Sequence, residues 1–183
     1  MKNPQIIKNI FSEEDFKIIS DYFKNHKFLK NIAFDENGRR GVGDKTDQIL
    51  NDYSEKLLPI AKSFFKSDSL KQSYTLFTEY SAKNINLPRH TDANACTYTI
   101  DLVVYQDRPW GLWIEGKEYI ANEGEAIFFW GEEQEHWREE ITRNDNVVAV
   151  IFFHYVEPDH WFFTKGPEYL EEIKKIKRKQ MGL

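Results

Sequence analysis

The sequence predicts one α+β domain, in which an antiparallel β-sandwich or barrel is supported by helices at both ends. Three observations lead to this fold class. Apolar residues recur at helical spacing in the first third, short strand-like runs follow one another in the middle, and a last helical pattern closes the chain. A length of 183 residues corresponds to about one domain, so we treat residues 1–183 as a single unit.

The N-terminal part, residues 1–70, is predicted to be mainly helical and to support the rest of the domain. Ser12 followed by three acidic residues is typical of a helix start. The apolar residues that continue this helix are Phe16, Ile19 and Phe23. A second helical stripe consists of Leu50, Tyr53, Leu57, Ala61 and Phe64. Pro59 is expected to interrupt and kink this second helix, and the polar, glycine-rich residues 35–43 are predicted to form a loop.

Residues 72–156 consist of short runs rich in aromatic and β-branched residues, separated by turn sequences. The predicted strands are 74–80, 97–105, 111–114, 118–121, 125–130, 136–141 and 147–155, with a short extended stretch at 90–92. Because no helical pattern lies between them, seven or eight strands in succession indicate an antiparallel sandwich or barrel. Gly166 and Pro167 then open a final helix, residues 166–180.

Composition excludes several classes of protein. Hydrophobic residues make up 40% and aromatic residues 15%, which is enough for a sizeable core and excludes wholesale disorder. No run approaches the ~18 uncharged apolar residues of a membrane span. The net charge of −5 argues against a nucleic-acid partner. The single cysteine, Cys96, excludes an intramolecular disulfide and favours a reducing, cytoplasmic setting.

The sequence His90-Thr91-Asp92 is the first candidate for chemistry. Side chains at positions i and i+2 of an extended segment share one face, so the imidazole and the carboxylate would point the same way. A second histidine would complete the two-histidine, one-carboxylate set of non-haem Fe(II) oxygenases, which leaves three positions open on the metal. The motif by itself is weak, because a loop histidine paired with an aspartate gives the same short pattern.

The order of features around this motif is more specific. Tyr80 ends the preceding strand, a polar loop leads to His90, and a hydrophobic strand, a hairpin and the apolar segment 125–130 follow before His136. Over residues 72–156 this order resembles the 2-oxoglutarate- and Fe(II)-dependent dioxygenase superfamily, on the prolyl-4-hydroxylase-like branch. The resemblance implies a double-stranded β-helix, or jelly roll, with His90, Asp92 and His136 as catalytic metal ligands.

The other histidines form a rival set. His136 lies among acidic residues and could be an exposed bystander, but it opens a strand directly after an apolar one. His154 ends a very apolar strand, where a core or rim histidine with a satisfied hydrogen bond is expected. His160 lies beyond the barrel, where a surface loop is expected, and neither has a carboxylate two residues away. We therefore keep both outside the predicted ligand set.

The resemblance also implies a cation for the far carboxylate of 2-oxoglutarate. In many members that residue begins the last strand, but this chain has Asp145 and Asn146 there. Arg138, two residues past His136 on the same strand, is the favoured replacement. One two-residue repeat spans ~6.6 Å, close to the spacing between the metal and the far carboxylate of the cosubstrate, and a guanidinium can hold a carboxylate bidentately. Arg143, in the following turn, is the alternative. Tyr80 would add a hydroxyl to the cosubstrate.

The predicted activity is therefore oxidation of a substrate by an Fe(II)- and 2-oxoglutarate-dependent dioxygenase, with O2 consumed, succinate and CO2 released, and ascorbate as a possible reductant. The substrate is a peptidyl proline or a small molecule, which the sequence does not decide. Two alternatives stay open. One is a cupin-like metal-binding jelly roll that does not use 2-oxoglutarate. The other is a non-catalytic binding module on the same fold.

Overall fold

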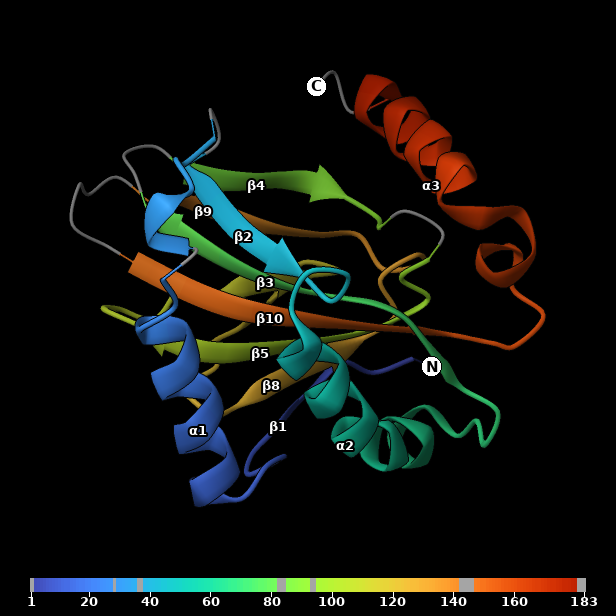
Figure 1. Cartoon of the computed structure of the whole chain (residues 1–183). Coiled ribbons are helices and arrows are strands. Elements are labelled where there is room, and N and C mark those ends of the chain that lie inside the picture. Colours follow the sequence, from blue (N-terminus) through green and yellow to red (C-terminus); the bar gives the residue numbers. More distant parts are fainter. Residues whose placement is uncertain are drawn as a thin grey trace.

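The computed structural model describes residues 2–27, 29–35, 38–81, 85–92, 95–141 and 147–180. These residues form two antiparallel sheets and three α-helices (Figure 1). The larger sheet has the strand order β1-β8-β5-β10-β3-β2, and the smaller one has the order β4-β9-β6-β7. Two facing sheets of this kind make the predicted jelly roll, so the predicted fold class is confirmed. Among the helices of the described residues, none is long and apolar enough to cross a membrane.

The larger sheet consists of β1 (Gln5–Ile7), β2 (Arg39–Gly43), β3 (Lys71–Ser81), β5 (Tyr98–Gln106), β8 (Ala126–Phe129) and β10 (Val147–Val156). The smaller sheet consists of β4 (Ile85–His90), β6 (Leu112–Ile114), β7 (Lys117–Tyr119) and β9 (His136–Ile141). The helices are α1 (Glu13–Lys24), α2 (Gln48–Phe65) and α3 (Trp161–Gln180), and a short 3-10 turn spans Leu29–Asn31. The seven longer predicted strands are present, with ends that differ by a few residues. The extended stretch predicted at 90–92 is different, because strand β4 ends at His90 and includes residues 85–89, which were predicted to belong to a polar loop.

The two N-terminal helices lie on one face of the larger sheet (Figure 1). Ser12 caps α1 as predicted, since its side chain accepts a hydrogen bond from the Asp15 amide at 3.0 Å. Helix α2 continues through Pro59 without a break, contrary to the expected interruption. The reason is its buried stripe, because Leu50, Tyr53, Leu57 and Ala61 belong to the core on both sides of Pro59 and outweigh one lost backbone hydrogen bond.

Alternation along the strands separates this core from the interior of the barrel. Phe77 on β3 and Phe153 on β10 belong to the core under the helices, together with Ile100 on β5. The neighbouring residues on the same strands point the other way, toward the smaller sheet. Thr78 on β3, Phe152 on β10 and the β5 residues next to Ile100 therefore line a cavity between the two sheets.

Residues 39–43 differ from the prediction that 35–43 form a loop, and residues 36 and 37 of that range lie outside the described residues. Arg39–Gly43 is strand β2, which pairs with β3 in the register Arg39↔Tyr80 to Gly43↔Leu76. A Cβ atom at Gly41 would lie 2.2 Å from the Phe77 carbonyl oxygen, so glycine is what allows this close pairing. The sequence resembles a loop because its strand conformation depends on a distant partner. The short strand β1, paired with β8, was also not predicted.

The C-terminal helix begins earlier than predicted. Helix α3 starts at Trp161, and Gly166 and Pro167 lie within it rather than opening it. The His160 side chain accepts a hydrogen bond from the Phe162 amide at 3.2 Å, and the Phe162 ring lies 6.4 Å from that of Tyr74. The helix thus starts where its aromatic residues meet the barrel.

Candidate metal and cosubstrate site

Pairing between β4 and β9 brings two histidines together. His90 is the last residue of β4, His136 is the first residue of β9, and the two are register partners. Their rings lie 4.3 Å apart, and the Phe129 ring packs edge-on against His136 at 4.9 Å. Only 15% of the His90 side chain and 4% of the His136 side chain are exposed. The two imidazoles predicted to share a site are therefore adjacent and largely buried.

Asp92 completes the group just beyond β4. Its Oδ1 atom lies 3.7 Å from His90 Nε2 and 3.5 Å from His136 Nε2. Its amide donates a hydrogen bond to the Gly131 carbonyl at 2.7 Å, and its Oδ2 accepts one from Thr99 Oγ1 at 3.2 Å. A Cβ atom at Gly131 would lie 2.2 Å from Asp92 Oδ2, so the carboxylate occupies space that only glycine leaves open.

Backbone carbonyls set the tautomer of both histidines. His90 Nδ1 lies 2.7 Å from the Pro88 carbonyl oxygen, and His136 Nδ1 lies 2.9 Å from that of Gln134. A carbonyl only accepts hydrogen bonds, so in each neutral ring Nδ1 carries the proton and Nε2 keeps its lone pair. Two Nε2 lone pairs and one carboxylate oxygen lie within 4.8 Å of one another, a donor set that fits a divalent transition metal such as Fe(II).

The electrostatics of the group also suit a cation. Burial would raise the pKa of Asp92, but the neighbouring His136 lowers it well below its usual range, so this carboxylate is ionised. Burial would lower the pKa of His136, but the charge of Asp92 raises it above the usual value. The charge of Asp92 thus favours positive charge beside it, which a bound divalent ion would supply in place of a proton on His136.

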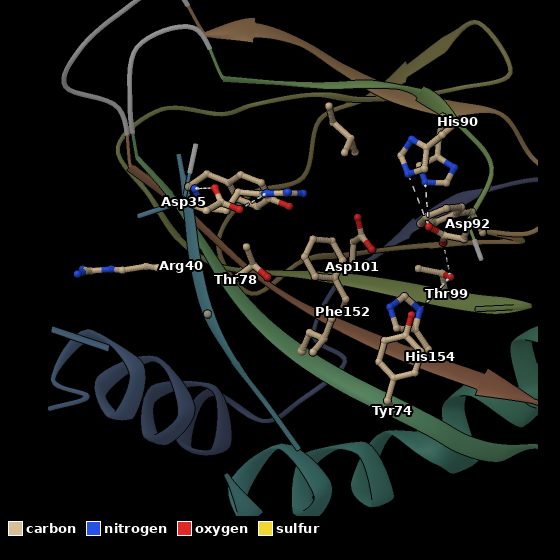
Figure 2. A pocket seen from close by; sticks show the side chains of 17 residues that line it. Asp35, Arg40, Tyr74, Thr78, His90, Asp92, Thr99, Asp101, Phe152 and His154 are labelled. Carbon is tan, nitrogen blue, oxygen red and sulfur yellow. Dashed lines mark hydrogen bonds and ion pairs between the residues drawn. The ribbon is translucent and has the colours of Figure 1, made fainter. Parts of the chain in front are cut away.

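His90 and Asp92 lie at one end of a cavity of about 390 Å3 (Figure 2), which His136, next to His90, also lines. Asp35 lies at the other end, and Asp101 and Phe152 lie between the two (Figure 2). Such a volume is within the usual range for small-molecule sites. The cavity can hold a ligand of the size of 2-oxoglutarate with room beside it.

Arg138 lies deeper than the cavity wall. It is on the same face of β9 as His136, as predicted, and only 2% of its side chain is exposed. Its Nη2 lies 3.4 Å from Asp101 Oδ2, and its Nη1 donates a hydrogen bond to the Trp110 carbonyl. Sequence reasoning did not identify Asp101, which lies on β5 and has no short motif that marks it. Arg138 is thus buried beside the cavity, with a carboxyl group as its neighbour.

Tyr80, the other residue predicted to bind the cosubstrate, lines the cavity. Its ring packs edge-on against Trp110 at 5.2 Å, and burial raises the pKa of its hydroxyl to about 12. The hydroxyl therefore stays neutral and can donate a hydrogen bond. Arg143, the alternative anchor, lies outside the described residues.

The two histidines kept outside the predicted ligand set, His154 and His160, lie in different places. His154 lines the cavity, and its Nδ1 lies 3.2 Å from Thr99 Oγ1, in line with the expected satisfied histidine. It also forms a second cation-capable group with Asp92 and Cys96, which shares Asp92 with the first group and was not predicted from the sequence. His160 lies 3.8 Å from Glu132 and is partly buried at the start of α3, not in an exposed loop.

Comparison with known proteins supports the fold. No family model matches the sequence, and no curated protein matches it. EctD from S. alaskensis with bound Fe has a TM-score of 0.69 at 10% identity, over 87% of this chain and 74% of that chain. HygX from Streptomyces hygroscopicus with nickel and 2-oxoglutarate has a TM-score of 0.64 at 8% identity, over 86% of this chain and 84% of that chain.

A third similar structure is the non-heme alpha ketoglutarate dependent epimerase SnoN from nogalamycin biosynthesis. Its TM-score is 0.64 at 9% identity, over 85% of this chain and 78% of that chain. At such low identities these likenesses establish the fold, which is the jelly roll of 2-oxoglutarate- and Fe(II)-dependent oxygenases. They do not single out the prolyl-4-hydroxylase branch.

Proposed function

We propose that this chain is an Fe(II)- and 2-oxoglutarate-dependent dioxygenase that oxidises an unidentified organic substrate. The observation that carries the proposal is the group His90, Asp92 and His136, whose donor atoms lie within 4.8 Å of one another at the end of a cavity in a jelly roll. The solved structures with this fold include proteins that hold iron, or nickel with 2-oxoglutarate.

In this proposal the two Nε2 atoms and Asp92 Oδ1 would hold the metal on one side and leave the cavity side open. When bound, Fe(II) would supply activation of O2 coupled to decarboxylation of 2-oxoglutarate to succinate and CO2. The chain itself orients the ligands through the Pro88 and Gln134 carbonyls. It also excludes water by burying the group against Phe129.

Arg138 and Tyr80 are the residues that would bind the far carboxylate of the cosubstrate. Both are buried beside the cavity, on β9 and β3, and each carries hydrogen-bond donors. The neutral Tyr80 hydroxyl can donate one hydrogen bond, and the Arg138 guanidinium can supply the positive charge.

We favour a small organic molecule as the substrate over a peptidyl proline. The cavity of about 390 Å3 is partly walled by aromatic side chains, including Tyr74 and Phe152. Among the similar structures, HygX was solved with hygromycin B and EctD with 5-hydroxyectoine, both small molecules. Peptidyl proline stays in the test set. We place the activity in the cytoplasm, where a reducing environment keeps Fe(II) and the Cys96 thiol in their reduced states.

The test is succinate release from 2-oxoglutarate by the protein supplied with Fe(II), O2 and ascorbate, across a panel of small molecules and proline peptides. Turnover that needs all three components, and that His90→Ala lacks, is the expected result. Zinc in place of iron should abolish it, because zinc has no redox chemistry. Absence of succinate above the His90→Ala background in every mixture would contradict the proposal.

A second candidate function is a cupin-like metal protein that does not use 2-oxoglutarate. The observation that favours it is the contact between Arg138 and Asp101, because a carboxyl group already lies where the far carboxylate would bind. Metal binding without any binding of 2-oxoglutarate would select this second function.

A further inference from the structure

This inference rests on the proposed function and concerns the middle of the cavity, between the metal ligands and Asp35, where Asp101 contacts the buried Arg138. Both side chains are almost fully buried, with 2% and 3% of their surfaces exposed. Arg138 also donates to the Trp110 carbonyl, and its guanidinium lies 5.1 Å from the Trp110 ring. Of the two residues, Asp101 is the one that lines the cavity.

Asp101 has an unused hydrogen-bonding atom. Its Oδ2 atom faces Arg138, but its Oδ1 atom is buried without a hydrogen-bond partner among the described residues. An orphaned carboxyl oxygen is costly, and such atoms in folded proteins call for an explanation. A ligand that reaches this part of the cavity can provide the missing partner.

Charge balance decides the form in which Asp101 can accept a ligand carboxylate. An anion that approaches Arg138 must also come next to Asp101, since the two side chains are 3.4 Å apart. One guanidinium would then face two carboxylates in a buried place, which leaves a net negative charge without a partner. Asp101 cannot turn away to solvent, because it lies on the internal strand β5 between β8 and β10. One proton on Asp101 removes the excess charge.

We propose that Asp101 belongs, with Arg138 and Tyr80, to the subsite for the far carboxylate of 2-oxoglutarate, and that Asp101 binds it as the neutral acid. The Asp101 hydroxyl donates its hydrogen bond to the carboxylate, while Arg138 supplies the positive charge. The proton comes from solvent, so one proton is taken up for each 2-oxoglutarate that binds to the protein with ionised Asp101.

The environment of Asp101 agrees with this role. Burial raises the pKa of Asp101 to about 7, although the charge of Arg138 opposes the rise. The other titratable and charged groups that line the cavity are Asp35, Arg39, Arg40, Tyr74, Tyr80, His90, Asp92, His136 and His154. A bound divalent metal adds positive charge at Asp92 and moves the Asp101 midpoint downward. The slope of affinity against pH is therefore a better test than the midpoint.

The experiment is anaerobic calorimetry of 2-oxoglutarate binding to the Mn(II)-saturated protein between pH 6 and 9. For the wild type we expect affinity to fall about tenfold per pH unit above the Asp101 pKa, with proton uptake approaching one in buffers of different ionisation enthalpy. Asp101→Asn should bind 2-oxoglutarate with no pH dependence, because its amide is neutral and still donates a hydrogen bond.

Two controls isolate the subsite. Asp35→Asn removes another carboxyl group from the same cavity and should keep the wild-type slope. The keto acid 2-oxobutyrate, which lacks the far carboxylate, should bind with little pH dependence. Tight binding of 2-oxoglutarate to the wild type without a slope or proton uptake would overturn this inference and leave the proposed function intact. Loss of binding by Asp101→Asn would also overturn it. No binding to the metal-saturated wild type at any pH would overturn the proposed function itself.

Discussion

The metal group and the Arg138–Asp101 pair meet different electrostatic requirements. In the metal group, formed by His90, Asp92 and His136, each histidine Nδ1 atom meets a backbone carbonyl, and Asp92 Oδ2 meets Thr99. In the Arg138–Asp101 pair, two opposite charges contact each other, and one carboxyl oxygen has no hydrogen-bond partner among the described residues. The metal group is organised for a cation before the cation binds. The pair is neutral overall without a ligand, so binding of an anion requires uptake of a proton from solvent or separation of the two charges.

The largest effect is expected from the ligands of the metal group. His136→Ala should lower Fe(II) or Mn(II) affinity by at least about 100-fold, because a facial site loses one of three protein donors. Anaerobic metal titration measures this directly. His160→Ala is the matched control, since His160 contacts Glu132 at the start of α3 and lies outside the metal group. Equal metal affinity in wild type and His136→Ala would refute the ligand assignment.

A smaller but still large effect is expected at the Arg138–Asp101 pair. Arg138→Ala should weaken 2-oxoglutarate binding by about 30-fold or more, since truncating a buried charge pair costs about 2–5 kcal/mol. Metal affinity should stay close to that of the wild type. Arg138→Lys should recover only part of the loss, because a point charge does not replace a planar fork.

Arg143→Ala separates the two candidate anchors in the same binding assay. If Arg143→Ala weakened 2-oxoglutarate binding and Arg138→Ala did not, the far carboxylate would bind away from Asp101. The comparison between the metal group and the Arg138–Asp101 pair would then no longer hold.

The next effect tests whether the metal group depends on the space that the missing side chain of Gly131 leaves for Asp92. Gly131→Ala places a methyl group 2.2 Å from Asp92 Oδ2, so we expect metal affinity to fall about tenfold or more, as for other changes that displace a ligand. Gly111→Ala is a matched control. Its Cβ would also lie at 2.2 Å, but from the end of the exposed Glu118 side chain, which can move away. Equal metal affinities of the two variants would show that Asp92 has room to shift.

The smallest effect is expected at the second cation-capable group. His154→Ala should change metal affinity by less than about threefold, because its Nδ1 hydrogen-bonds with Thr99 and it is outside the proposed ligand set. The same metal titration measures it. A loss as large as that of His136→Ala would place the metal between Asp92, Cys96 and His154 instead.

The sequence alone determined the features that depend on local spacing. Strand alternation and turn residues predict the succession of strands from β3 to β10, and the i, i+2 relation predicts that His90 and Asp92 share a face. The same relation predicts that Arg138 follows His136 on one face of β9. The inference for His136 and Arg138 needs only the geometry of one strand, β9. Asp92 lies just beyond β4, and its place beside His90 also depends on the hydrogen bond from its amide to the Gly131 carbonyl.

Only the tertiary structure decided what lies opposite each of these residues. Residues 39–43 form a strand because β3 pairs with them, although their glycines and charges are typical of a loop. Gly131 matters because Asp92 needs the space that its missing Cβ leaves. Asp101 comes within 3.4 Å of Arg138 from a strand 37 positions earlier in the chain. Such contacts arise from packing two sheets together, and no periodicity within one segment encodes them.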